Sequence, residues 1–250
     1  MKGKLPVWAE KAAAVLVWLL VWQLAAVLIA KPLLLPSPAA TALTLLRLAS
    51  GPGFWQTIGM SMLRVSAGIL CAVVLGLVCA VLCCRSALLR LLFSPLLTVI
   101  KSAPVASFTI LLLVWLRRDI VPSVISALIV LPVVWSNVST GIRQTDVQLL
   151  EMARVFRFSR LKVLRRIYVP SVKPYFVSAC RSAIGFGWKA GIAAEVLTVP
   201  ALSIGKMIFE SKQYLMTEEL FAWTAATVIL SVIIEKLALG LMGGGKNDKS

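Results

Sequence analysis

Long apolar segments recur along the chain and constrain its fold more than any other feature. An α-helix of about 20 apolar residues crosses the hydrocarbon core of a bilayer, which is about 30 Å thick. Hydrophobic residues make up 60% of the chain, above the roughly 45–50% of soluble domains. The sequence therefore predicts an all-α membrane protein with six transmembrane helices. These cover about 12–30, 64–84, 94–116, 120–142, 173–197 and 220–241.

The distribution of charge predicts how the chain is oriented. The net charge is +16, and Lys and Arg concentrate in the cytoplasmic loops of membrane proteins. With a cytoplasmic N-terminus, most basic residues fall on the inner side, although the pair Arg117-Arg118 falls outside. Both termini and the loop 143–173 are thus expected in the cytoplasm. The inner residues are Lys2, Lys4, Lys11, Arg85, Arg90, the cluster from Arg143 to Lys173, Lys236, Lys246 and Lys249.

One basic, amphipathic stretch interrupts the apolar pattern at 151–170, with the sequence EMARVFRFSRLKVLRRIYVP. Met152, Val155 and Phe156 have the i, i+3, i+4 spacing of one apolar helix face. Ser159 is a suitable N-cap for a second helix. The stretch is too short and too charged to span a membrane, so it predicts a helix–turn–helix in the cytoplasmic loop.

Three functions are compatible with this helix–turn–helix, which Pro170 is expected to end. It could lie on anionic lipid headgroups, but that role needs no turn. It could bind nucleic acid, but the chain contains no further nucleic-acid module. It could dock into a soluble cytoplasmic partner, as amphipathic helices commonly do.

The same stretch resembles the EAA loop of ABC importer permeases, through Glu151-Met152-Ala153, Ser159-Arg160 and Ile167-Tyr168-Val169-Pro170. In that family the loop forms coupling helices, which sit in a cleft of the ATP-hydrolysing subunit. The resemblance extends from about 57 to 241 and is greatest for the nitrate/sulfonate/taurine branch, which also contains permeases for thiamine-precursor pyrimidines. It also rests on SMLRVSAG at 61–68, SPLLTVIKSAPVASF at 94–108 and AGIAAEV at 190–196.

The resemblance implies a set of residues that couple the chain to an ATPase, with two departures from the family pattern. The family usually has Ala where Met152 stands and Gly where Arg157 stands. Gly permits a turn with positive φ. Arg157 is thus expected either to adopt that conformation, at a cost on the order of 1 kcal/mol, or to shift the turn toward Phe158-Ser159. The implied coupling residues are Glu151, Met152, Ala153, Arg157, Ser159, Arg160, Leu164 and Pro170.

Four ionisable residues lie within the predicted spans: Lys101, Arg181, Lys189 and Glu195. A charge near the bilayer centre costs roughly 2.5–3.5 kcal/mol on insertion scales, so such residues usually face a cavity or a partner. They predict a polar translocation path for a polar or anionic solute. The alternatives are an internal pair between Lys189 and Glu195, snorkelling of Lys101 or Arg181 to an interface, or access of Glu195 to water.

The function implied by the resemblance is that of a permease subunit without an activity of its own. No GxxxxGK[ST] motif occurs, so ATP is expected to bind to a separate ATPase subunit, and no cofactor or metal is expected in this chain. The expected cargo is a small polar or anionic solute that resembles a sulfonate, nitrate, taurine or a pyrimidine. The alternative is a stand-alone ion-coupled carrier or channel with Lys189 and Glu195 as a relay. An enzyme ranks last, because the chain has no His and no evident nucleophile–base set.

The expected assembly is a homodimer in the bacterial cytoplasmic membrane, with two ATPase subunits inside and a solute-binding protein outside. Its expected organisation has three parts. Residues 1–56 hold the N-terminal tail, the first span and an outer interfacial segment. Residues 57–242 form the permease core, with the coupling loop at 143–172, and residues 243–250 form a cytoplasmic tail.

Overall fold

The computed structural model describes residues 7–241, and every regular element in that range is helical, which confirms the all-α prediction. Lys2, Lys4 and the tail at 243–250 lie outside the described residues. The elements are α1 (Val7–Ile29), α2 (Pro38–Ala49), α3 (Pro52–Arg85), α4 (Ala87–Ser102), α5 (Val105–Leu112), α6 (Val121–Arg143), α7 (Val147–Val155), α8 (Arg160–Val163), the π-helical turn η1 (Leu164–Tyr168), α9 (Val169–Thr198), α10 (Ile204–Gln213) and α11 (Thr217–Leu241).

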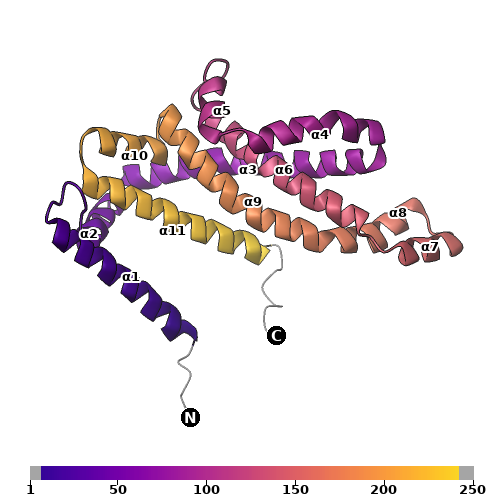
Figure 1. Ribbon diagram of the computed structural model, residues 1–250, viewed down its shortest axis with the longest axis horizontal. Coiled ribbons are helices and arrows are strands. Elements are labelled where there is room, and N and C mark those ends of the chain that lie inside the picture. Colours follow the sequence, from indigo (N-terminus) through magenta and orange to yellow (C-terminus); the bar gives the residue numbers. More distant parts are fainter. Residues whose placement is uncertain (1–6, 242–250) are drawn as a thin grey trace, which may run out of the picture.

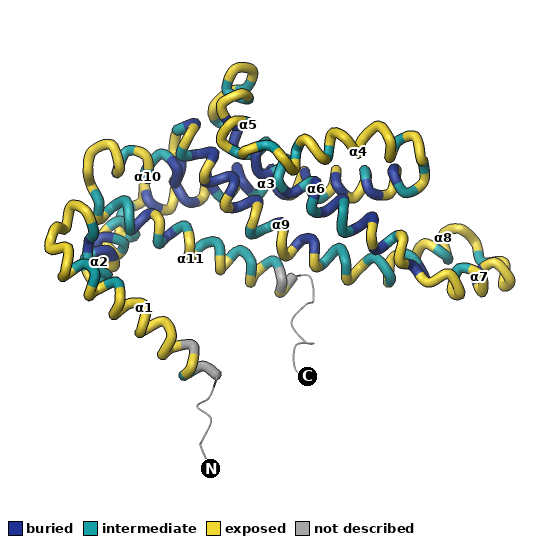
Figure 2. The backbone as a smooth tube through the Cα atoms, viewed as in Figure 1, coloured by how far each residue is buried: buried dark blue, intermediate teal, exposed yellow. Residues whose placement is uncertain are grey.

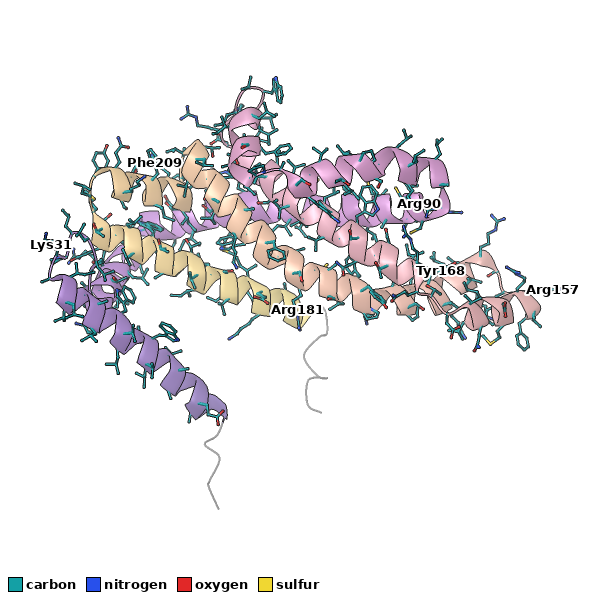
Figure 3. The ribbon with its side chains drawn as sticks, viewed as in Figure 1. Lys31, Arg90, Arg157, Tyr168, Arg181 and Phe209 are labelled. Carbon is teal, nitrogen blue, oxygen red and sulfur yellow. The ribbon has the colours of Figure 1, made fainter. Side chains whose placement is uncertain are left out.

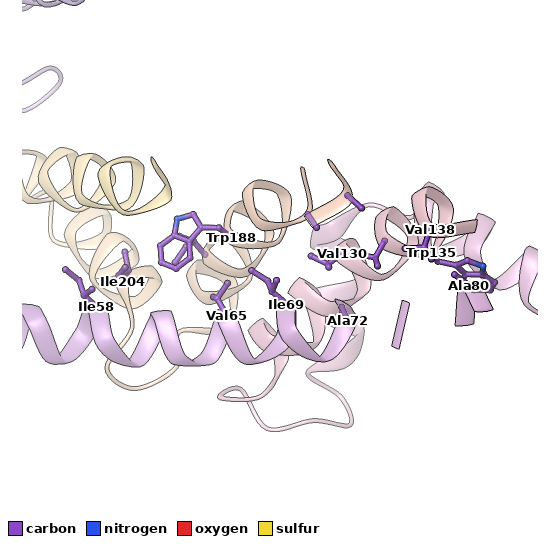
Figure 4. Packing of buried hydrophobic residues seen from close by; sticks show 14 of the residues in the cluster. Ile58, Val65, Ile69, Ala72, Ala80, Val130, Trp135, Val138, Trp188 and Ile204 are labelled. Carbon is purple, nitrogen blue, oxygen red and sulfur yellow. The ribbon is translucent and has the colours of Figure 1, made fainter. Parts of the chain in front are cut away.

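Helices α3, α6 and α9 form the centre of the molecule (Figures 1 and 2). Their buried side chains make one apolar core, in which Val65 and Ile69 of α3 lie near Trp188 of α9 (Figure 4). Glycine lets the backbones approach closely. A Cβ built on Gly68 would lie 2.1 Å from the carbonyl oxygen of Ser123, so α3 and α6 could not pack this closely around a larger residue.

The number of spans differs from the prediction of six. Four helices are long and apolar enough to cross a membrane, namely α1, α3, α6 and α11. Helices α4 and α5 are bent by 106° and could together form a fifth. Helix α9 has 30 residues but does not qualify by apolar composition within the described part of the chain; it contains Lys173, Arg181, Lys189 and Glu195. The count of six spans is therefore not confirmed.

The prediction of one continuous helix over 94–116 is wrong, because the helix is interrupted between α4 and α5. Pro104 has no backbone N–H to continue a helix, and it disfavours helical dihedrals in the residue before it. Ala103 is accordingly extended, with φ −82° and ψ 136°. Helix α2 lies in the segment expected to follow the first span, and α10 begins directly after Ser203, whose hydroxyl caps it.

Two sets of short helices lie at opposite ends of the long axis of the molecule (Figure 1). Helices α7 and α8 project beyond the bundle at one end, whereas α2 and α10 cover the other. Helix α1 exposes most of its apolar surface (Figure 2). It is attached at the α2 end, where the indole Nε1 of Trp22 donates to the carbonyl oxygen of Pro36 at 3.1 Å.

Candidate functional site

The helical hairpin formed by α7, α8 and η1, residues 147–168, is the element that corresponds to the predicted coupling loop. It begins earlier than expected, because Asp146 caps α7: its carboxylate accepts from the backbone N–H of Gln148 at 2.8 Å. The predicted cap of the second helix is confirmed. The hydroxyl of Ser159 accepts from the backbone N–H of Lys162 at 3.4 Å.

The turn of the hairpin settles which conformation Arg157 adopts. Its φ is 48°, so the first of the two predicted alternatives is observed. The N–H of Phe158 donates to the carbonyl of Ala153 at 2.8 Å, and the N–H of Arg157 donates to that of Arg154 at 3.1 Å. This bonding pattern is a Schellman motif, whose left-handed position is usually occupied by glycine. Arg157 therefore adopts the strained conformation with its side chain exposed at the tip of the hairpin (Figure 3).

Pro170 stands at the boundary between the hairpin and α9, but it does not interrupt the helix. Helix α8 continues through η1 into α9 without a break, and Pro170 lies in the first turn of α9. A proline ring normally clashes with the carbonyl four residues earlier. The π turn at Leu164–Tyr168 widens the helix just before the proline, which provides room for that ring. The second arm of the hairpin, α8 and η1, and α9 are therefore parts of one helical run.

The outer surface of the hairpin combines exposed apolar and basic side chains. Val155 is 78% exposed and Phe156 69% exposed. Met152, Leu161 and Leu164 are also exposed, whereas Ala153 is buried inside the hairpin. Of the remaining predicted coupling residues, Glu151, Ser159 and Arg160 lie on the exposed surface. Apart from Pro170, the predicted residues thus come together on one small element.

The base of the hairpin is fixed to the bundle by contacts between α6 and α9. The hydroxyl of Tyr175 hydrogen-bonds the side-chain oxygen of Gln144. The ring of Tyr175 also packs on Gly141, where an added Cβ would lie 2.9 Å from it. The apolar tip therefore projects from an anchored base.

Among the predicted path residues, Glu195 is completely buried, and sequence reasoning missed its partner. One carboxylate oxygen lies 3.0 Å from a guanidinium nitrogen of Arg64. The other accepts from the hydroxyl of Ser61 at 2.8 Å and from the backbone N–H of Gly205 at 3.2 Å. Two alternatives for Glu195 are therefore wrong: it neither pairs with Lys189 nor reaches water.

The Arg64–Glu195 pair connects four helices at the end of the molecule opposite the hairpin. Besides Glu195 of α9, Arg64 of α3 donates to the carbonyl of Ala201 at 3.1 Å. The carbonyl of Arg64 accepts from the hydroxyl of Ser123 on α6 at 2.7 Å. On the α10 side, an added Cβ at Gly205 would lie 2.3 Å from the Cβ of Glu195. The pair therefore fixes the connection between α9 and α10.

The other three path residues lie apart from Glu195. Lys101 is exposed in the last turn of α4, beside the break before α5, and its ammonium donates to the hydroxyl of Ser136 at 2.9 Å. It lies 14 residues after Ala87, about 21 Å along the helix. Arg181 and Lys189 are exposed on α9 and make no ion pair or side-chain hydrogen bond within residues 7–241. No ion pair or side-chain hydrogen bond within residues 7–241 joins any two of the four path residues.

No group of three or more His, Cys, Asp or Glu side chains that could hold a metal ion occurs within the described part of the chain. The geometry provides an exposed hairpin at one end and a buried ion pair at the other. Between them lie three exposed cations on α4 and α9.

Comparison with known proteins gives a family match over residues 72–242, described as "Binding-protein-dependent transport system inner membrane component". A protein of Bacillus subtilis (strain 168) assigned to aliphatic sulfonate transport is 26% identical over 87% of this chain and 78% of its own length. The bicarbonate transport system permease of Synechococcus elongatus is 32% identical over 64% of this chain. The match covers 58% of that relative.

A third relative, the taurine transport system permease of Escherichia coli (strain K12), is 23% identical over 90% of this chain and 82% of its own length. The sulfonate and taurine relatives, together with a nitrate import permease of Leptolyngbya laminosa at 30% identity, confirm the predicted nitrate/sulfonate/taurine branch.

Proposed function

This chain belongs to the family of binding-protein-dependent transport system inner membrane components, and on that premise we propose that it forms the membrane path of an importer for a small anionic or zwitterionic solute. Sulfonates, nitrate, bicarbonate and taurine, which its relatives carry by name, fit this class. Pyrimidine-like solutes are the less favoured cargo, because three exposed cations of the predicted path favour an anion.

The observation that carries the proposal is the exposed hairpin at one end of the bundle. It offers a large apolar surface to a partner, and it is continuous with α9. A soluble ATPase subunit that gripped the hairpin would therefore act directly on a central helix. Since the chain contains no phosphate-binding loop motif, the energy would come from ATP bound and hydrolysed by that subunit.

The proposed path follows Lys101, Arg181 and Lys189. Their positive charges are not cancelled by Glu195, because Arg64 already neutralises that carboxylate. A path with uncancelled cations attracts anions and repels metal cations. We propose that Glu195 serves the path indirectly, by holding the α9–α10 connection in place, since its buried side chain offers no surface to a solute.

The proposed assembly contains two copies of the chain, so that a path can form between them. Both termini and the hairpin would lie in the cytoplasm, as the positive-inside tendency suggests. A solute-binding protein would then meet the opposite end, where α2 and α10 lie (Figure 1). The three-part organisation into 1–56, 57–242 and 243–250 belongs to the same proposal.

A stand-alone carrier with a Lys189–Glu195 relay is less well supported. Such a relay needs a carboxylate that exchanges protons or ions with the path. Glu195 is instead buried and bound by Arg64, Ser61 and the backbone of Gly205. A relay through Lys189 would therefore lack its acidic member.

Co-purification tests the proposed function. The tagged chain is expected to bring down a soluble ATPase, and the variant Val155→Asp/Phe156→Asp should lose it because its apolar contact becomes charged. Tyr214 and Leu215 are similarly exposed at the other end, so Tyr214→Asp/Leu215→Asp is the matched control. ATPase retention by the hairpin variant, or uptake of solute into vesicles without nucleotide, would refute the proposal.

A further inference from the structure

The hairpin carries a concentration of positive charge, and no acidic side chain within residues 7–241 forms an ion pair with it. Six cations stand between 147 and 168, and Glu151 is the single acid there. All six are exposed. The ion pairs within residues 7–241 lie elsewhere, at Arg64–Glu195, Arg117–Asp119 and Lys206–Glu210. The six cations are Arg154, Arg157, Arg160, Lys162, Arg165 and Arg166.

These cations are interleaved with exposed apolar groups rather than separated from them. The ammonium of Lys162 lies 3.8 Å from the centre of the Phe158 ring, as a cation–π contact. The rings of Phe156 and Phe158 are 6.4 Å apart. Stable interfaces commonly surround an apolar centre with a polar rim of complementary charge. The hairpin has both parts of such a surface.

We propose that the hairpin docks in an apolar groove whose rim is lined by Asp and Glu side chains, on the soluble ATP-hydrolysing subunit. The aromatic and aliphatic side chains at the tip supply the buried contact. The six cations steer the partner into place and fix its orientation. This inference rests on the proposed function, and it adds the chemistry that the partner surface must have.

Anionic headgroups are the competing target for the same charges. A helix that lies on a membrane keeps a continuous apolar face toward the lipid and a basic face toward water. The hairpin instead projects along the long axis, with Arg157 at its far tip (Figure 3). Its exposed apolar residues Val155 and Phe156 also lie near that tip. This geometry presents the tip to a partner beyond the bundle, rather than to the plane of the membrane around it.

Salt dependence distinguishes steering from purely apolar docking. The Debye length falls from about 10 Å at 0.1 M salt to about 3 Å at 1 M. Charge-steered association is expected to slow roughly 10-fold or more between 0.05 and 0.5 M NaCl, while dissociation changes little. Purely apolar docking would keep its association rate over the same range.

The test uses the full chain in nanodiscs of zwitterionic lipid and the purified ATPase recovered by co-purification. The variant Arg160→Glu/Arg165→Glu/Arg166→Glu should lower the association rate roughly 10-fold or more. None of these three side chains makes an ion pair or side-chain hydrogen bond within the described residues. The control Arg117→Glu/Arg118→Glu/Lys212→Glu makes the same change in net charge outside the hairpin and should leave the rate within about 2-fold.

Zero-length cross-linking tests the partner chemistry directly. Lys162 is the one lysine between 143 and 172. Carbodiimide should therefore join its amine, as an amide, to an Asp or Glu of the ATPase, and mass spectrometry would identify the linked peptides. Lys162→Arg keeps the charge but should lose this product, while it retains salt-dependent binding.

The outcomes separate the two proposals. An ATPase that fails to bind at any salt concentration would contradict the proposed function itself. Binding with a rate that ignores both salt and the triple reversal would overturn only the acidic groove. The acidic groove would also be overturned by one pattern of results with the triple charge reversal. In that pattern the variant loses binding to vesicles with about 30% anionic lipid, roughly the charge of a cytoplasmic leaflet, but associates with the ATPase at an unchanged rate.

Discussion

Removal of Arg64 is expected to destabilise the protein more than loss of an ordinary surface charge. The variant Arg64→Met leaves the carboxylate of Glu195 buried without its cation. Breaking a buried pair in this way costs about 3–5 kcal/mol. With roughly 2–4 °C per kcal/mol for a chain of 150–250 residues, the apparent melting temperature should fall by about 6–20 °C.

A second variant shows whether the uncompensated charge is the cause. In Arg64→Met/Glu195→Gln the side-chain oxygen at 195 can still accept from Ser61 and from the N–H of Gly205, but no charge remains. Most of the lost stability should return, and the residual cost should be about 1–2 kcal/mol for imperfect packing and altered hydrogen bonds.

Thermal unfolding in detergent, followed with a thiol-reactive dye, measures these effects. Cys83 and Cys180 are buried and free, so they react as the bundle opens. The reasoning would be refuted if Arg64→Met melted within about 2 °C of the native protein, a shift of less than roughly 1 kcal/mol. It would also be refuted if the double variant Arg64→Met/Glu195→Gln were no more stable than Arg64→Met.

Three further predictions concern the turn, the packing and the path. Arg157→Gly should stabilise the hairpin by about 0.5–1 kcal/mol, because glycine adopts the left-handed conformation without strain. Amide hydrogen exchange in the hairpin should slow in this variant, whereas Arg157→Ala should leave the exchange rate unchanged. Gly191→Val should cost about 1–3 kcal/mol, because an added Cβ would lie 2.4 Å from the hydroxyl of Ser126. Gly185→Val should be tolerated in the same melting assay, since nothing lies within 4 Å of its added Cβ. Lys101→Met should lower anion uptake into vesicles at least about 5-fold without a change in melting temperature, because the attraction between the ammonium and the anion, roughly 1 kcal/mol, is lost. Uptake at the native rate would show that Lys101 is not part of the path.

Local signals made the hairpin predictable. Ser159 sits where a cap is needed, and the spacing of Met152, Val155 and Phe156 fits one helix turn; both features depend on neighbours within a few residues. The partner of Glu195 depends on Arg64, which is 131 residues away in the chain. Periodicity carries no information about such a contact. Two opposite charges in separate apolar segments are the signal that could have suggested it.

Prolines show why the third span was mispredicted. Pro95, Pro132 and Pro174 all lie inside continuous helices, so a proline within an apolar segment does not by itself indicate a break. Neighbouring helices can satisfy the freed backbone groups in such cases. Pro104 follows an extended Ala103, and here the helix does end. Tertiary packing decides between the two outcomes, and an average of hydropathy over 94–116 cannot detect that difference.

The second arm of the hairpin and Glu195 of the buried pair lie on one continuous helical run, and this connection links the two ends mechanically. Arg160 to Thr198 is unbroken and spans about 58 Å at 1.5 Å per residue, nearly twice the thickness of the hydrocarbon core. Glu195 lies near one end of the run and holds α10 through Gly205. A displacement of the hairpin is therefore delivered to the α9–α10 connection unless the run bends. The π turn at Leu164–Tyr168 is the one non-α segment of this run. Any bending of the run would therefore occur mainly at this turn, which lies between the tip that binds the partner and the bundle.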